Sequence, residues 1–287
     1  MSTKWEGGDP MIKKQLIMEK AFELFAKNGI EATSVQQITE VCGISKGAFY
    51  LSYKSKDELV FALIDYFLSD MAANIEQAVS EDSQNETLLY HFYYQIFSSY
   101  QSHSNFAKVL IKEQFTSCSM ELFDQLSKYD QFMNSVIFSI VDRQYPSVKE
   151  TMRPDLVYTI KSFSKMYAEL FFISNYPFEL DQVCKSLVEK VTVIANQTSI
   201  PLISTEYLTY TSTKPITPSK EELLNLLTVK KDEITDPTIQ QSLDLLMNDL
   251  LNPQLPGAIV QGLLKNLQAN SHSKWTAYLY KTYLETK

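Results

Sequence analysis

Apolar side chains recur every three or four positions along most of the chain, which is the spacing of helices that bury one face. The first instance joins Ile17, Ala21 and Leu24 and predicts an amphipathic helix over 11–27. Gly29 follows as a stop, because glycine readily takes the left-handed conformation that ends many helices. The pattern therefore predicts a first helix that ends just before Gly29.

Three further helices are predicted in quick succession, each starting at a Ser or Thr cap. The caps are Thr33, which forms a capping box with Gln36, then Ser45, and then Ser55, which forms a capping box with Glu58. Gly43 has to end the first of these helices, which leaves only residues 46–52 for the second. Two short helices joined by a tight glycine turn are the pattern of a helix-turn-helix.

Helical periodicity continues to about residue 197, and two of its segments favour self-association. Residues 155–176 carry apolar groups on two faces, so one face can meet the core while the other needs a partner. Residues 180–194 have the 4-3-4-3 spacing of a helix–helix seam, at Leu180, Cys184, Leu187, Val191 and Ile194. The alternative is that both segments are central helices of a bundle.

The composition changes at residue 198, where a predicted linker of 22 residues contains 13 Ser, Thr or Pro. Helical signals resume at a capping box of Ser219 with Glu222 and at the cap Asp236, which is followed by proline. An apolar stripe follows at Ile239, Leu243, Leu246 and Leu250. After it, two shorter helices are predicted over 256–269 and 273–285. Helices this short cannot bury their stripes alone, so we expect the extension to dock on the preceding helical domain or on another protomer.

The scarcity of glycine and cysteine argues against several kinds of binding and catalytic site. The chain has 7 Gly, none of them between 48 and 256, so it holds no glycine-rich phosphate-binding loop. Its 3 Cys and 3 His are scattered, which argues against disulfides, a zinc motif or any other cofactor site and favours the cytoplasm. A catalytic pair of Cys118 with His103 would lack a group that orients the imidazole. No run of apolar residues is long enough to span a membrane.

Positive charge is concentrated near the N-terminus of an acidic chain. The net charge is −8, yet seven Lys face four Glu between residues 10 and 56. Lys56 opens a helix, where a cation opposes the helix dipole unless a phosphate binds there. Gly47 weakens a two-turn helix by about 1 kcal/mol relative to alanine, and close approach to a DNA groove would explain it.

Residues 17–59 resemble the DNA-binding domain of the TetR family of bacterial transcriptional regulators. The matching positions are Ile17, Ala21, Leu24-Phe25, Gly29, Thr33, Ile38, Gly43-Ile44-Ser45-Lys46-Gly47-Ala48-Phe49-Tyr50, Tyr53, Lys56 and Leu59. Leu51-Ser52 departs from the Tyr-His that is common in the family, which leaves an apolar side chain on the predicted reading face. The family pattern usually ends near Gln197, so it does not extend to residues 198–287.

The resemblance implies an all-α homodimer that binds double-stranded operator DNA. It predicts a three-helix DNA-binding domain over 11–56 and a larger helical ligand-binding and dimerisation domain over 57–197, with the linker and helical extension over 198–287. The expected DNA contacts are Thr33, Ser45, Lys46, Gly47, Tyr50, Leu51, Lys54 and Lys56. The expected function is a repressor of an inverted-repeat operator, not an enzyme.

A small hydrophobic or aromatic effector is expected to release the DNA, because 13 of the 61 residues over 85–145 are aromatic, against 12% of the chain. The residues expected to line its pocket are Tyr93, Phe97, Phe115, Phe132 and Tyr167. Those expected in the dimer interface are Phe163, Phe171, Leu187, Val191 and Ile194. The alternative is a TetR-like protein that receives its signal from a protein partner through the extension.

Overall fold

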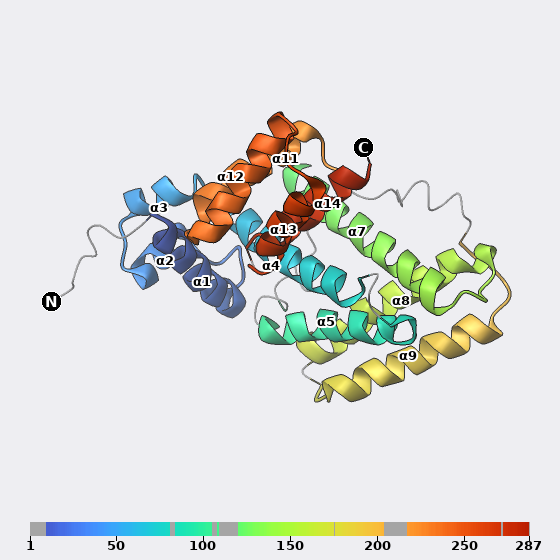
Figure 1. The fold of residues 1–287 in the computed structure, drawn as a ribbon. Helices are drawn as coiled ribbons and strands as arrows, with labels where there is room; N and C mark the ends of the chain where they lie inside the picture. The colour runs from blue at the N-terminus through green and yellow to red at the C-terminus, as the bar shows by residue number, and fades with distance from the viewer. Residues whose placement is uncertain are drawn as a thin grey trace. The chain divides into compact units, whose positions relative to one another are not determined.

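The computed structural model describes residues 10–80, 84–104, 108, 120–174, 176–203, 217–270 and 272–286, and these form helices without a strand (Figure 1). They divide into two compact units. The first unit holds the described parts of 1–70 and 217–287 together with Lys108, and the second holds those of 71–107 and 111–216. The all-α fold predicted from the sequence is confirmed.

The N-terminal part of the first unit is a helix-turn-helix. Its helices are α1 (Pro10–Asn28), α2 (Val35–Cys42), α3 (Lys46–Ser52) and α4 (Lys56–Ala78), of which α4 belongs to this unit up to Asp70. Helices α1, α2 and α3 pack against one another around Ile17, Phe25, Ile38 and Phe49, which are all fully buried. The short helix over 46–52 has the bounds that the sequence predicts.

The capping box of α2 lies one residue later than predicted. Ser34 is the cap, its hydroxyl accepting from the Gln37 N–H while the Gln37 side chain accepts from the Ser34 N–H. Thr33 is only 1% exposed, and its hydroxyl donates to the Gly29 carbonyl at 2.8 Å. Its own N–H donates to the Ile30 carbonyl. Thr33 therefore closes the turn after α1 and leaves the cap to its neighbour.

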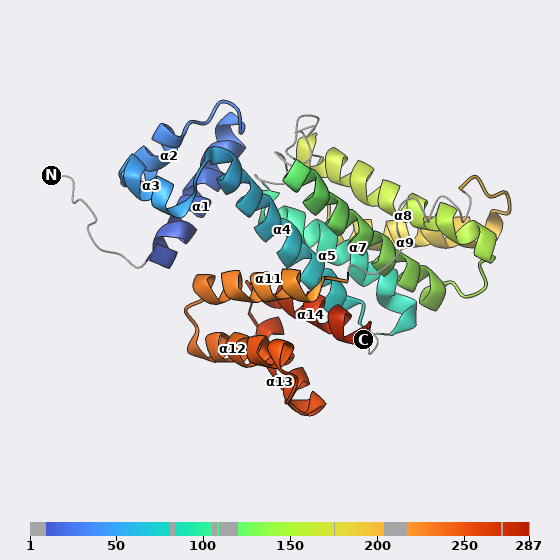
Figure 2. The same ribbon diagram turned by 90° about the horizontal axis from the view of Figure 1, so that it is seen from above.

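The C-terminal extension adds four helices to the first unit. They are α11 (Lys220–Glu233), α12 (Pro237–Leu251), α13 (Gly257–Gln268) and α14 (Lys274–Glu285). Each packs on the next and α14 returns to α11, so the four helices close on themselves (Figures 1 and 2). The predicted capping box of Ser219 with Glu222 and the cap at Asp236 are both present. Their common core holds the fully buried Leu227, Leu243, Leu246, Leu267 and Ala277.

The extension shares a compact unit with the helix-turn-helix, whereas the sequence suggested docking on the helical domain or on another protomer. The His272 ring, just before α14, lies 5.2 Å from the Tyr66 ring of α4, measured between centroids. Burial lowers the pKa of His272, and Lys230 of α11 lowers it further. Glu233 and Asp70 act in the opposite direction but do not reverse the shift.

We expect the free energy of unfolding to fall as the pH drops below about 6.5, the pKa of an unfolded histidine. The pKa of His272 is lower in the folded chain, so the unfolded state takes up the proton first, and stability is lost between the unfolded and the folded pKa. Urea unfolding between pH 7.5 and 5 measures this loss. His272→Gln should flatten the profile, whereas Gln101→Ala, at an exposed site without a titratable group in α5 (Leu88–Ser102), should leave it unchanged.

The second unit is a helical bundle that starts with the last residues of α4. Besides α5 it contains η1 (Asn85–Thr87), α7 (Met120–Gln144), η2 (Glu150–Met152), α8 (Arg153–Ala168), the π-helical turn η3 (Glu169–Ile173) and α9 (Leu180–Gln197). The sequence predicted one continuous helix where α8 and η3 follow each other. The π turn contains the consecutive Phe171 and Phe172, which are both buried.

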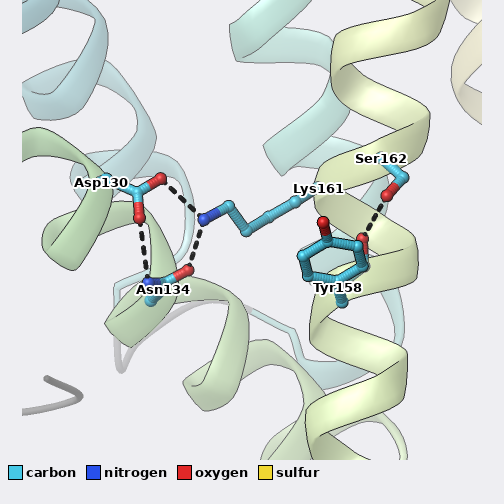
Figure 3. Close-up of polar contacts among 5 residues, drawn as sticks. All are labelled: Asp130, Asn134, Tyr158, Lys161 and Ser162. Carbon is cyan, nitrogen blue, oxygen red and sulfur yellow. Dashed lines mark hydrogen bonds and ion pairs between the residues drawn. The ribbon is translucent and has the colours of Figure 1, made fainter. Parts of the chain in front are cut away.

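A polar cluster ties α8 to α7. Lys161 of α8 donates to Asp130 at 2.7 Å and to Asn134 at 2.8 Å, and Asn134 in turn donates to Asp130 (Figure 3). The next residue of α8 is Ser162, and its hydroxyl donates to the Tyr158 carbonyl of the same helix. Because Asn134 is buried and its amide has partners on both sides, the cluster fixes how the two helices align.

Candidate functional site

Helix α3 is held to its domain by one side only. The Ser45 hydroxyl caps it by accepting from the Ala48 N–H at 3.1 Å, and Phe49 is fully buried beneath it. Tyr53 ends the helix, with its ring tilted against Phe49 at 6.1 Å. These anchors leave the opposite side of α3 facing solvent.

The solvent-facing side of α3 consists of Lys46, Gly47, Tyr50 and Leu51, all of which are exposed. Tyr50 is 52% exposed and Leu51 is 89% exposed, so both present apolar surface to water. A Cβ atom built on Gly47 would meet only the Ser45 hydroxyl, at 3.8 Å. Nothing in the described chain therefore requires glycine at this position. These four expected DNA contacts lie together on one surface.

The two lysines that follow α3, Lys54 and Lys56, differ in exposure and in hydrogen bonding. Lys54 is exposed, although its backbone N–H donates to the Glu58 carboxylate. Lys56 is half-buried and its ammonium donates to the Ile30 carbonyl at 3.0 Å, which ties the start of α4 to the turn before α2. That bond uses one of its three donors. Thr33 was also among the expected DNA contacts, but its hydroxyl is buried and already donates to the Gly29 carbonyl.

The extension lies close to the end of α3. Burial raises the pKa of the Tyr53 hydroxyl, and Glu233 at the end of α11 raises it further. Glu233 also pairs with Lys230 at 2.9 Å. No pattern in the sequence predicts that Glu233 and Tyr53 lie close together, because the two residues are 180 positions apart and no motif joins them.

Three of the rings expected to line an effector pocket, Tyr93, Phe97 and Tyr167, belong to one aromatic cluster in the second unit. Tyr93 stacks on Phe97, and both Phe97 and Tyr167 contact Phe171 at 5.8 Å between centroids. Phe132 is also buried, and Phe115 lies outside the described residues. Tyr93, Phe97 and Tyr167 are therefore joined through ring contacts among themselves and with Phe171.

The seam expected to form a dimer interface faces inward. Leu187 and Val191 are fully buried where α9 packs on α5 and α8, and Phe171 is buried in the aromatic cluster. Phe163 and Ile194 are half-buried. The apolar side chains exposed on these two helices are instead Tyr158, Met166 and Val193. The 4-3-4-3 spacing identified a packed face correctly, but that face belongs to the core of the protomer.

The described residues give little support for a catalytic or metal site. Among them, no three His, Cys, Asp or Glu side chains are grouped for a metal ion, and no helix has the length and hydropathy to cross a membrane. Burial raises the pKa of the Cys42 thiol to about 11 and that of Cys184 to about 12, so both stay protonated at neutral pH. Cys118 lies outside the described residues.

Comparisons with known proteins point to one class of protein. Residues 17–63 match the family model of bacterial regulatory proteins, tetR family. The chain is 25% identical over 264 residues to the uncharacterized HTH-type transcriptional regulator YerO of Bacillus subtilis, covering 89% of both chains. Because residues 217–287 make up about a quarter of the chain, this match includes part of the extension.

Two further similarities concern parts of the chain. The HTH-type transcriptional repressor AcnR of Corynebacterium efficiens is 32% identical over 82 residues, 29% of this chain and 42% of that protein. The crystal structure of the regulator FadR from Bacillus subtilis in complex with stearoyl-CoA has a TM-score of 0.55 and 18% identity. It covers 64% of this chain and 99% of FadR, which shows a shared fold.

Proposed function

This chain belongs to the TetR family of bacterial transcriptional regulators, and we propose that it represses transcription as a homodimer bound to an inverted-repeat operator. Each protomer places α3 in the major groove of one half-site. The observation that carries the proposal is the bare outer side of α3, where Lys46, Gly47, Tyr50 and Leu51 face solvent above the buried Phe49. The dimer contact uses the exposed apolar side chains of α8 and α9.

Operator binding is expected to weaken steeply with salt. Lys46, Lys54 and Lys56 of two protomers neutralise roughly 4–6 phosphates, so log K should fall against log salt with a slope of about −4 to −5. Fluorescence anisotropy with labelled double-stranded DNA measures the slope. Lys54→Ala should flatten it by about 1 to 2 units, while Lys265→Ala in α13 should not change it. A slope near zero in the wild type would exclude α3 as the DNA-binding surface.

We further propose that an apolar effector binds at the aromatic cluster of the second unit and lowers operator affinity. The stearoyl-CoA bound to FadR supports this class of ligand for a protein of the same fold. Since Phe97 contacts both Tyr93 and Phe171, the effector has to separate these rings, and binding selects a more open conformation of the unit.

Phe97→Leu is expected to change the effector concentration that releases the operator, while operator affinity without effector stays as in the wild type. Leucine removes the ring contacts with Tyr93 and Phe171 but keeps most of the buried volume. The measurement is titration of the operator complex with stearoyl-CoA or stearic acid. Tyr94→Leu, at an exposed site on the same helix, is the matched control. Equal release curves for all three proteins would contradict this site.

The second candidate is a protein signal received through the extension. It is favoured by one observation, that residues 217–286 share a compact unit with the helix-turn-helix. A thermal shift screen with hydrophobic compounds distinguishes the two candidates, since a bound effector raises the melting temperature. A flat response across the compounds would favour the protein signal.

A further inference from the structure

Leu51 is the most exposed large apolar side chain among those described in helices, with 89% of its surface open to water. A leucine in a folded helix usually gains stability by burying its side chain. Leu51 gains almost none, although it follows directly on Tyr50 and lies two residues after the buried Phe49. The folded chain alone therefore gives no reason for leucine here.

Gly47 explains why Leu51 has no neighbour on its own helix. Side chains in a helix lean toward its N-terminus, so Leu51 leans over the residue four positions earlier, which is Gly47. Gly47 offers no side chain to pack against, and the space around its missing Cβ is open apart from the Ser45 hydroxyl. Its backbone is not left-handed, unlike that of Gly29 and Gly43, so the fold does not demand glycine.

Gly47 and Leu51 thus form a small gap in the helix surface next to an exposed apolar side chain. Both lie on the side of α3 that the proposed function places in the major groove. In that groove, the apolar feature that distinguishes one base from the others is the C5 methyl group of thymine. Lys46, on the same side of α3, carries donors suited to the acceptors of guanine. The apolar side chain of Leu51 next to the ammonium of Lys46 therefore complements a thymine methyl group next to the acceptors of a guanine.

We propose that Leu51 is a specificity-determining residue that packs against the C5 methyl group of a thymine in each half-site. Gly47 supplies the clearance that lets the backbone of α3 come close enough for this contact. The inference rests on the proposed function and adds the base that the site reads.

The test starts from a DNA site selected by the full-length wild-type protein from a pool of randomised double-stranded oligonucleotides. Each thymine of the selected half-site is then replaced by deoxyuridine, which lacks only the methyl group, in both halves at once. We expect one thymine position where the replacement weakens binding about fourfold per half-site, or about fifteenfold for both. In Leu51→Ala the same replacement should change the dissociation constant by less than about twofold, because the partner of the methyl group is gone.

Two further variants separate this contact from general effects. Leu202→Ala removes a leucine that is also 89% exposed but lies beyond α9, and it should keep the full penalty for uracil. Gly47→Ala should raise the melting temperature, because alanine favours helix over glycine, yet weaken binding to the selected site by about tenfold. A more stable protein with unchanged affinity would overturn the role of Gly47.

The inference is overturned if the selected half-site contains no thymine, if uracil is tolerated at every position by the wild type, or if Leu51→Ala keeps the same penalty. Failure of the proposed function has a different signature. In that case the pool yields no enriched site, and the protein binds no double-stranded DNA at low salt.

Discussion

Leu246→Ala is expected to destabilise the DNA-binding unit, although Leu246 lies in the extension and far along the chain from α3. Leu246 is fully buried in α12, and its carbonyl accepts a hydrogen bond from the Tyr280 hydroxyl of α14 at 3.2 Å. Truncating a buried leucine to alanine costs about 2–5 kcal/mol. Because the extension and the helix-turn-helix form one compact unit, we expect DNA binding to be lost at the same lowered temperature at which the extension melts.

Leu245→Ala is the matched control, since Leu245 is the preceding residue of the same helix but is 44% exposed. Circular dichroism melts and DNA-binding anisotropy at increasing temperature, run on both variants and the wild type, measure the effect. Leu245→Ala should behave as the wild type in both. If Leu246→Ala lowers the melting temperature of the extension but leaves DNA binding unchanged at every temperature, the extension is an independent module.

Phe49→Ala and Tyr50→Ala should separate folding from recognition at neighbouring positions of α3. Phe49 is fully buried, so losing its ring should cost about 3–5 kcal/mol and remove DNA binding by unfolding the helix-turn-helix. Tyr50 is half exposed, so its loss should leave the melting temperature nearly unchanged. If its hydroxyl donates to a charged phosphate, affinity falls by about 1.5–3 kcal/mol, or roughly 12- to 140-fold.

Both variants are measured by thermal melting and by binding to operator and to unrelated DNA. Loss of a phosphate contact should weaken both DNAs alike, since phosphates carry no sequence information. A Tyr50→Ala protein that loses affinity for the operator alone would show instead that Tyr50 reads bases. A Phe49→Ala protein as stable as the wild type would contradict the described core.

Local signals in the sequence were sufficient to predict most helix boundaries. Ser45 caps α3, and Ser219 with Glu222 caps α11, because a hydroxyl and a carboxylate at the right spacing meet the free N–H groups of a helix wherever it lies. Ser34 took the place of Thr33 for a tertiary reason. Both residues are good caps, and only the turn after α1, which occupies the Thr33 hydroxyl, decides between them.

The errors and omissions involve contacts between distant segments. The seam of Leu187 and Val191 has one apolar face, and whether that face meets α5 or a second protomer depends on the bundle around it. The π turn of η3 depends likewise on the cluster that receives Phe171 and Phe172. The approach of His272 to Tyr66 joins residues that no short-range pattern connects.

Because the described parts of residues 1–70 and 217–287 belong to one compact unit, that unit cannot be completed until the end of translation. A ribosome adds about 5–20 residues per second, so roughly 10–40 s pass between synthesis of residue 70 and that of the last helix of the extension. During this time the nascent helix-turn-helix lacks the partner helices with which it forms its unit. The second unit can fold during this time, before the helices of the extension that complete the first unit are synthesised. A chain interrupted after α9 would thus carry every side chain that we propose to contact DNA on an unfinished unit.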